Sequence, residues 1–172
     1  GVYMSTPFSA KAFEFLSSIN VVAFKIGSGE SNNLPFLNLV ASAGKPLIVS
    51  TGMHDIKIVE KIYSNLSSSN TQFALLHTTN LYPTPDHLVR LGAITEMKQQ
   101  FTDIEIGLSD HTIGNLACLG AISLGANILE RHFTDTFSRE GPDIVNSMDP
   151  AELKELSLNS KKELKPKCLV YL

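Results

Sequence analysis

Several features common in other protein classes are missing from this sequence of 172 residues. Its two cysteines, Cys118 and Cys168, form no CxxC pair and no disulfide framework, which favours a reducing compartment. The 14 Lys and Arg against 17 Asp and Glu give a net charge of −3, which argues against a nucleic-acid-binding surface. No apolar run approaches the roughly 18–20 residues that cross a bilayer, and no secretory signal opens the chain. We therefore expect a cytoplasmic protein that binds neither nucleic acid nor membranes.

What remains is the composition of one globular domain, with 43% hydrophobic and 18% charged residues. Short apolar runs alternate with longer amphipathic stretches along the chain. The runs are apolar on both faces, which is typical of parallel strands covered on both sides by helices. The strands predicted in this way are Val2–Ser5, Val21–Ile26, Pro46–Ser50, Phe73–His77, Ile104–Leu108 and Ile128–Phe133.

Helices are predicted between these strands from their apolar spacing and from residues that favour helix starts. They are Ala10–Ser18 after Ser9, Asn33–Ala43, Asp55–Leu66, Asp86–Gln99, Ile113–Leu124, and a last helix that begins at Pro150 after Asp149. Alternating strands and helices indicate right-handed βαβ units and a parallel sheet. Two architectures remain, an open doubly wound sheet and a (β/α)₈ barrel, and no GxGxxG motif follows any strand.

Polar and ionisable residues gather where the predicted strands end. Strand entries such as Val21–Val22 and Leu47–Ile48 are apolar instead. In a barrel, catalytic residues stand at the strand ends, so this sorting predicts an enzyme site there. The polar exits are Ser5–Thr6, Lys25 with Gly27–Glu30, Ser50–Thr51, His77–Asn80 with Tyr82, Ser109–Thr112 and Glu130–His132.

A set of hydrogen-bond donors at these exits suits an anion, most simply a phosphate. Gly27 and Gly29 allow close backbone approach, and a lysine supplies a point charge to a phosphate. The alternative is that serine and glycine are merely common in loops and that the lysine is a solvated rim residue. The donors in question are Lys25, Ser28, Ser50 and Ser109.

His111 and His132 end consecutive predicted strands, so their imidazoles could converge. Two histidines leave open positions for substrate and water on a divalent metal such as Mn²⁺, with Glu30 or Asp110 as a further ligand or base. The spacing alone favours general acid–base catalysis or simple hydrogen bonding over a metal site.

Seven segments occur in the order and at the spacing of one known family. They are Ser5–Phe8, Lys25–Asn33, Ser50–Met53, Leu76–Pro85, Gly107–Thr112, Leu129–Thr134 and Gly141–Asp143. Over roughly residues 1–157 the chain therefore resembles the sialic acid synthase family, and within it the bacterial N-acetylneuraminate and legionaminate synthases.

The resemblance implies a (β/α)₈ TIM barrel enzyme that condenses phosphoenolpyruvate with N-acetylmannosamine or a related acetamido sugar. The products would be a nine-carbon sialic acid and phosphate. It also implies a homodimer that uses a divalent metal, most simply Mn²⁺. The legionaminate branch, with a 2,4-diacetamido sugar as acceptor, remains an alternative.

The resemblance further implies roles for individual residues. His111 and His132 would be the metal ligands and, with Lys25 and Glu30, the catalytic residues. Glu30 would lie by the metal and orient the water that adds to C2 of phosphoenolpyruvate. The implied substrate-binding residues are Thr6, Lys25, Ser28, Ser50, Asn80 and Ser109 for phosphoenolpyruvate, and Tyr82 and Asp143 for the sugar.

The family pattern is incomplete at both ends. About six of the eight strand–helix units of a barrel are present, and they match the third to the eighth. The first two strands and a C-terminal antifreeze-like domain are predicted to be absent, and the tail 157–172 departs from the pattern. We therefore expect residues 1–172 to be a partial barrel that is unstable and inactive alone. A binding module with a phosphate and metal pocket, and an aldolase or isomerase, remain alternatives.

Overall fold

The computed structural model describes residues 2–163 and 169–171, so Cys168 lies outside the described residues. The chain divides into two compact units, Gly1–Leu75 and Leu76–Leu172. Each unit is described by itself below.

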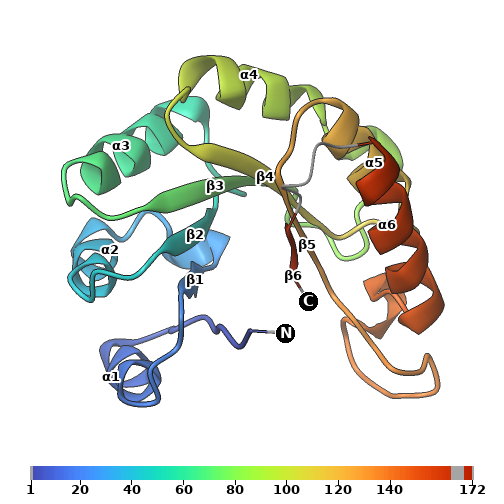
Figure 1. Ribbon diagram of the computed structural model, residues 1–172, viewed down its shortest axis with the longest axis horizontal. Coiled ribbons are helices and arrows are strands. Elements are labelled where there is room, and N and C mark those ends of the chain that lie inside the picture. Colours follow the sequence, from blue (N-terminus) through green and yellow to red (C-terminus); the bar gives the residue numbers. More distant parts are fainter. Residues whose placement is uncertain (1, 164–168, 172) are drawn as a thin grey trace. The chain divides into compact units, whose positions relative to one another are not determined.

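The first unit alternates helices with short buried strands (Figure 1). Its elements are α1 (Ala10–Ser18), β1 (Phe24–Ile26), η1 (Ser28–Glu30), α2 (Leu34–Ala41), β2 (Leu47–Ser50) and α3 (Ile56–Ser67). β1 and β2 pair in parallel, and every residue of both strands is buried. α2 and α3 pack against each other. Burial on both faces is what the uniformly apolar strand sequences predict.

The three helices of this unit begin at residues whose side chains cap them. Ser9 accepts a hydrogen bond from the Ala12 N–H, and Asp55 accepts one from the Ile58 N–H. Asn33 caps α2 in the same way. Such caps satisfy backbone donors that have no partner inside the helix, and they confirm the helix starts predicted from the sequence.

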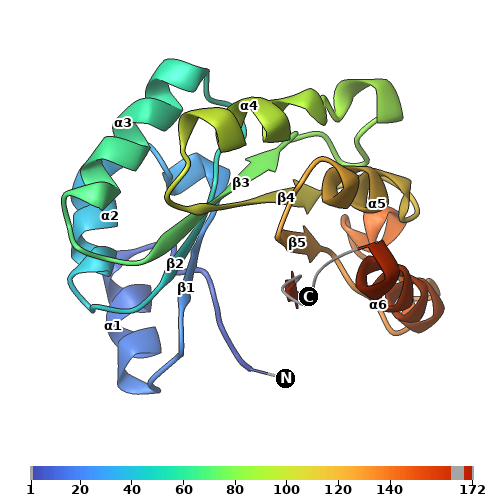
Figure 2. The same cartoon turned by 45° about the horizontal axis from the view of Figure 1, so that its top comes forward.

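The second unit continues the alternation after β3 (Phe73–Thr78), a strand that crosses from one unit into the other. Its further elements are η2 (Asp86–Leu88), α4 (Gly92–Gln100), β4 (Glu105–Asp110), α5 (Leu116–Ser123), β5 (Ile128–Arg131), η3 (Ile144–Asn146), α6 (Pro150–Glu163) and β6 (Leu169–Tyr171). β4 pairs in parallel with β5, and β5 with β6. α5 packs on β4 and on α6 (Figure 2).

β4 and β5 approach each other closely at Gly107. In the strand register Gly107 lies opposite Ile128. A β-carbon at position 107 would collide with the Ile128 carbonyl and with the side chains of Ile128 and Leu76. Glycine is therefore the residue that this part of the sheet accommodates, because close backbone contact leaves no room for a side chain.

The strand order identifies the architecture. The strands follow one another in the sheet in chain order, from β1 to β6. A doubly wound sheet reverses its strand order at a switch point, whereas a (β/α)₈ barrel adds its strands in sequence. The fold is therefore of the TIM-barrel class, and the described residues supply six of its strands.

The predicted first strand, Val2–Ser5, is wrong as a strand. Only Ser5 forms a bridge, to Phe24, and its carbonyl accepts a hydrogen bond from the Lys25 N–H. Val2 and Tyr3 are 74% and 63% exposed. An apolar pattern predicts that a segment can form a strand, but a strand also needs continuous pairing with a neighbour.

Two predicted helices are shorter than expected. The segment Asp86–Gln99 is interrupted at Arg90, whose φ of 55° lies in the left-handed region, so η2 and α4 form separately. The segment Ile113–Leu124 becomes helical only at Leu116, after Gly114 with a φ of 79°. β6 was not predicted, because it lies in the tail that departs from the family pattern.

Within the described residues, no helix combines the length and the apolar character needed to cross a membrane.

Candidate functional site

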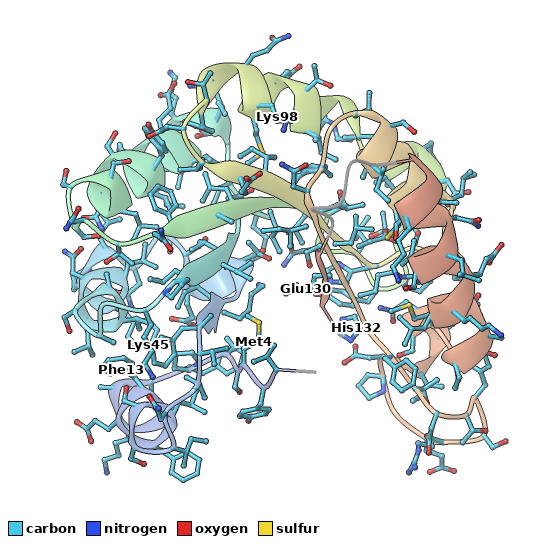
Figure 3. All side chains as sticks on the ribbon, viewed as in Figure 1. Met4, Phe13, Lys45, Lys98, Glu130 and His132 are labelled. Atoms are coloured by element: carbon cyan, nitrogen blue, oxygen red, sulfur yellow. The ribbon has the colours of Figure 1, made fainter. Side chains whose placement is uncertain are left out.

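Two histidines stand side by side in the second unit. His111 directly follows β4 and His132 directly follows β5, and Figure 3 labels His132 with Glu130 of the same strand. Because β4 and β5 are adjacent and parallel, the residues after their last pairs lie together. The centroids of the two imidazole rings are 5.3 Å apart.

Hydrogen bonds fix the orientation of His111. Its Nδ1 lies 2.9 Å from the Thr79 carbonyl oxygen, which can only accept, so Nδ1 carries the proton. The Nε2 atom then holds a lone pair that can bind a metal. The loop that supplies this carbonyl is itself attached to His111, because the Thr84 N–H donates to the His111 carbonyl.

His132 has a looser contact on the same side of its ring. Its Nδ1 faces Oδ2 of Asp143 at 3.7 Å, which is beyond hydrogen-bond distance. The segment that carries Asp143 returns to β5, because the Met148 N–H donates to the His132 carbonyl and the Thr134 N–H donates to the Met148 carbonyl. A carboxylate behind Nδ1 leaves Nε2 as the metal-binding atom, as in carboxylate–histidine–metal arrangements.

The environment keeps His111 uncharged. Burial lowers the pKa of His111 below its ordinary value, and the neighbouring His132 lowers it further, while the hydrogen bond to Thr79 opposes the shift. A histidine must be neutral to bind a metal. No group of three or more His, Cys, Asp or Glu side chains suited to a metal was found in 2–163 and 169–171. The histidine pair thus offers two protein ligands, and an ion bound there would need its other ligands from substrate and water.

Tyr82 covers the histidine pair. Its ring centroid lies 4.0 Å from that of His111 and 5.8 Å from that of His132, the latter edge-on. Burial raises the pKa of Tyr82, and the charges of Asp143 and Glu130 raise it further. The phenol is therefore protonated at neutral pH and can donate a hydrogen bond beside the two histidines.

Glu130 is a residue of this cluster to which the sequence analysis assigned no role. It lies opposite Ser109 in the β4–β5 register, and the Ser109 hydroxyl donates to Glu130 Oε1 at 2.6 Å. The alternation of side chains along β5 could have revealed it, because Glu130 and His132 must share one face of the strand.

Asn80 presents a buried acceptor that lacks a hydrogen-bond partner among the described residues. It follows β3, and its Oδ1 atom is inaccessible to solvent. Leaving such an atom unpaired is costly, so a ligand hydroxyl that donates to it would be stabilised.

His77 has a structural position instead. Its Nε2 lies 2.6 Å from the Val89 carbonyl, and burial lowers its pKa. This geometry is that of a packed, hydrogen-bonded residue.

The first unit brings together three predicted anion-binding residues. Lys25 lies in β1 and is 9% exposed, and its Nζ donates to Ser50 Oγ at 2.8 Å and to the Ile26 carbonyl at 3.0 Å. Ser28 follows β1, and its Oγ accepts a hydrogen bond from the Gly52 N–H. These contacts place an ammonium group and two hydroxyls at the carboxyl ends of adjacent strands.

His54 supports the loop that carries Ser28. Its Nε2 lies 2.9 Å from Ser31 Oγ and 3.1 Å from the Ser28 carbonyl. Thr6 and Glu30 also belong to the first unit, as half-buried residues after Ser5 and at the end of η1. The phosphoenolpyruvate contact predicted for Thr6 and the water-orienting role predicted for Glu30 remain predictions.

Comparisons with known proteins identify relatives of the whole chain. The model of the NeuB family matches residues 2–165. Human N-acetylneuraminate-9-phosphate synthase is 39% identical over 145 residues, which cover 84% of this chain and 40% of the human protein. N,N'-diacetyllegionaminic acid synthase of Campylobacter jejuni is 38% identical over 157 residues, which cover 90% of this chain and 47% of that enzyme.

A solved structure is similar as well. The N-acetylneuraminic acid synthetase from Leptospira borgpetersenii, crystallised with citrate, matches with a TM-score of 0.89 and 31% identity. The match covers 92% of this chain and 55% of that protein. The chain thus spans about half the length of the proteins that it resembles.

Proposed function

Because this chain belongs to the NeuB family, we propose that the intact protein containing it condenses phosphoenolpyruvate with an N-acyl sugar to form a sialic-acid-type product. The observation that carries the proposal is the His111–His132 pair, in which both Nδ1 atoms face oxygens and both Nε2 atoms suit a metal. The names of the human and Campylobacter relatives agree with this class of product.

In the proposed complex, the first unit binds the phosphate of phosphoenolpyruvate. The Lys25 ammonium and the hydroxyls of Ser28 and Ser50 would donate to its oxygens, and Thr6 would contact the same substrate. A buried lysine suits this task because a cation in a poorly solvated position attracts an anion strongly. The same donors would stabilise the negative charge that grows on the phosphate as it leaves.

The second unit binds the metal and the sugar in this proposal. A divalent cation such as Mn²⁺, held by His111 and His132, would supply Lewis-acid polarisation of a carbonyl oxygen. The protonated phenol of Tyr82 and the carboxylate of Asp143 would orient the sugar hydroxyls. Oδ1 of Asn80 would gain the donor that it lacks among the described residues.

The proposed reaction balances with water as its third reactant. The C2–C3 double bond of phosphoenolpyruvate opens as C3 bonds to the aldehyde carbon of the open-chain sugar, and the aldehyde oxygen takes a proton and becomes a hydroxyl group. Water, oriented by Glu30, adds to C2 and gives a tetrahedral centre. The bond between C2 and the phosphate oxygen then breaks, which yields the 2-keto acid and inorganic phosphate.

The test uses the intact protein with phosphoenolpyruvate and Mn²⁺. The acceptors are N-acetylmannosamine and a 2,4-diacetamido-6-deoxy sugar of the legionaminate type, and the readouts are phosphate release and mass of the product. We expect a nine-carbon product with one of the two acceptors, and light scattering should show a homodimer.

Histidine variants make the test specific. We expect His111→Ala and His132→Ala to lose at least 100-fold in turnover, because each removes a proposed metal ligand. The control is His87→Ala, at an exposed position in η2, which should retain full activity. Full activity in both ligand variants would contradict the proposed metal site, and no product with either acceptor would contradict the proposed reaction.

A further inference from the structure

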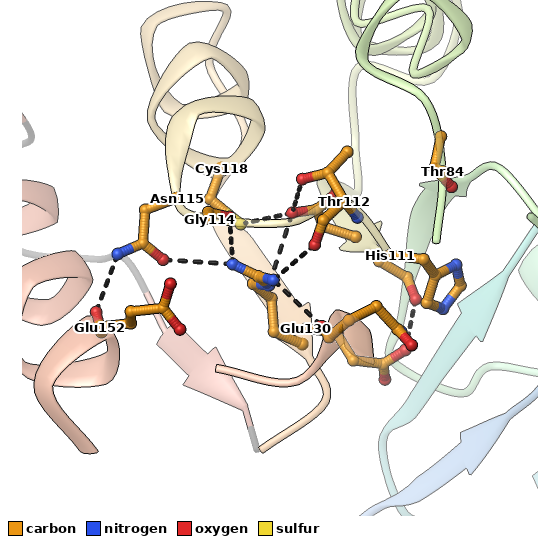
Figure 4. A network of polar contacts seen from close by, with 12 residues as sticks. Thr84, His111, Thr112, Gly114, Asn115, Cys118, Glu130 and Glu152 are labelled. Carbon is orange, nitrogen blue, oxygen red and sulfur yellow. Dashed lines mark hydrogen bonds and ion pairs between the residues drawn. The ribbon is translucent and has the colours of Figure 1, made fainter. Parts of the chain in front are cut away.

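Arg131 is buried directly before His132 and contacts several loops at once. It is 3% exposed and ends β5. Its Nη2 donates to the Thr112 carbonyl at 2.7 Å and to the Asn146 carbonyl at 3.2 Å. Its Nη1 donates to the Gly114 carbonyl and to Asn115 Oδ1 (Figure 4). One planar group thereby joins β5 to the loop after β4 and to η3.

Asp110 is the partner of Arg131 across the strands. The two residues lie opposite each other in the β4–β5 register, and Oδ2 of Asp110 lies 3.5 Å from Nε of Arg131. Asp110 also organises the loop that follows it, because its Oδ1 accepts from the Thr112 N–H and its Oδ2 from the Thr112 hydroxyl. Both side chains are 1% exposed.

This ion pair ends β4 and β5, and the histidine pair occupies the next position after each strand. Asp110 precedes His111 as Arg131 precedes His132, and successive side chains of a strand point to opposite faces. Asp110 faces α5, since Cys118 Sγ of that helix lies 3.5 Å from its Oδ2. His111 and His132 follow directly on Asp110 and Arg131, so the ion pair holds the two points at which the chain leaves β4 and β5 for the histidines.

We propose that Arg131, held by Asp110, is a positioning residue that sets the separation and orientation of His111 and His132 for a divalent cation. The proposal rests on the metal site of the proposed function. The guanidinium joins three segments, and each carries or adjoins a group around that site: His111, His132 or Asp143. An arginine is required because a lysine ammonium cannot donate in a planar fork to four acceptors.

Stability alone is a weak reason for such a pair. Burying two charges costs desolvation free energy, and apolar residues of similar volume often replace a buried ion pair without loss of stability. A role in the geometry of a neighbouring metal site accounts for a charged fork at this position, because groups behind metal ligands tune metal affinity by 10- to 100-fold.

The test is a titration of the intact protein with Co²⁺, followed by calorimetry and by the visible absorption of bound Co²⁺. We expect Arg131→Lys to weaken Co²⁺ binding about tenfold and to change the absorption bands. Asn115→Ala removes only one contact of the guanidinium and should weaken binding about threefold. Arg139→Lys, in an exposed pair with Asp135, is the matched control and should bind as the wild type does.

The Co²⁺ titration has three decisive outcomes. If the wild type binds Co²⁺ and both variants bind it more weakly and with a changed absorption spectrum, the positioning role is supported. If the wild type binds Co²⁺ tightly and both variants keep the same affinity and spectrum, the positioning role of Arg131 is overturned, while the metal site stands. No Co²⁺ binding by the wild type overturns the metal site and this inference together. If Arg131→Lys does not fold, unchanged binding in Asn115→Ala still overturns it.

Discussion

The Ser109 hydroxyl donates a hydrogen bond of 2.6 Å to the Glu130 carboxylate, across β4 and β5. The hydroxyl proton is therefore committed to a neighbouring anion rather than directed at a phosphate. We expect Ser109→Ala to lower turnover through Glu130, so that the variant adds little to the effect of Glu130→Gln. A double-mutant cycle on turnover measures this coupling.

The sequence-based prediction, in which Ser109 binds phosphoenolpyruvate, gives a different result in the same cycle. Ser109→Ala would then raise the KM for phosphoenolpyruvate, and its effect would be additive with that of Glu130→Gln. Additive effects would therefore contradict the coupling expected from the hydrogen bond.

Lys25 should govern the affinity for phosphoenolpyruvate. Replacing it by methionine removes a buried ammonium group that lies beside Ser50. Since hydrogen bonds to charged groups contribute about 1.5–3 kcal/mol, we expect Lys25→Met to raise the KM for phosphoenolpyruvate at least tenfold. The control is Lys57→Met, on the exposed face of α3. An unchanged KM in Lys25→Met would remove Lys25 from the proposed phosphate site.

His77 should make stability depend on pH. Burial lowers its pKa in the folded state, so below its ordinary pKa of 6.5 the unfolded chain binds the proton more readily. The free energy of unfolding should therefore fall as the pH decreases through about 6.5. His77→Gln keeps a donor near the Val89 carbonyl but does not titrate, so its stability should fall less steeply between pH 7.5 and 5.5. Equal slopes in urea unfolding would contradict this prediction.

Gly107 should be intolerant of a side chain. Because a β-carbon there collides with the backbone of Ile128, we expect Gly107→Ala to lower the free energy of unfolding by about 1–3 kcal/mol or more. Gly92→Ala is the control, since nothing lies within 4 Å of the β-carbon added at that position of α4. Thermal unfolding of both variants checks the difference, and equal melting temperatures would show that the two strands can separate at Gly107.

The sequence predicted most of the fold because helix caps and apolar spacing depend on residues that are close together in the chain. Ser9 caps α1 as expected, and the helices predicted to begin at Asn33 and Asp55 begin one residue later, with these two residues as their caps. The break at Arg90 escaped prediction because Arg90 itself is neither glycine nor proline and the apolar spacing continues through it, although Gly92 stands where α4 begins. The predicted strand Val2–Ser5 failed because pairing, unlike hydropathy, depends on distant residues.

Only part of the candidate site could be predicted from such local sequence patterns. Polar strand ends predicted the positions of His111 and His132, and the structure places their rings together. The role of Arg131 escaped notice because Glu130, Arg131 and His132 form one polar run in the sequence. Because successive side chains of a strand point to opposite faces, Arg131 faces away from Glu130. The strand register then places Arg131 opposite Asp110.

We propose above that His111 and His132 bind a divalent cation through their Nε2 atoms. Pulsed electron paramagnetic resonance of Mn²⁺ bound to the intact protein tests this binding, because ligand nitrogens couple to the electron spin. We expect coupling to two imidazole nitrogens, with one lost in His111→Ala and one in His132→Ala. A spectrum without nitrogen coupling, or one that both replacements leave unchanged, would contradict it.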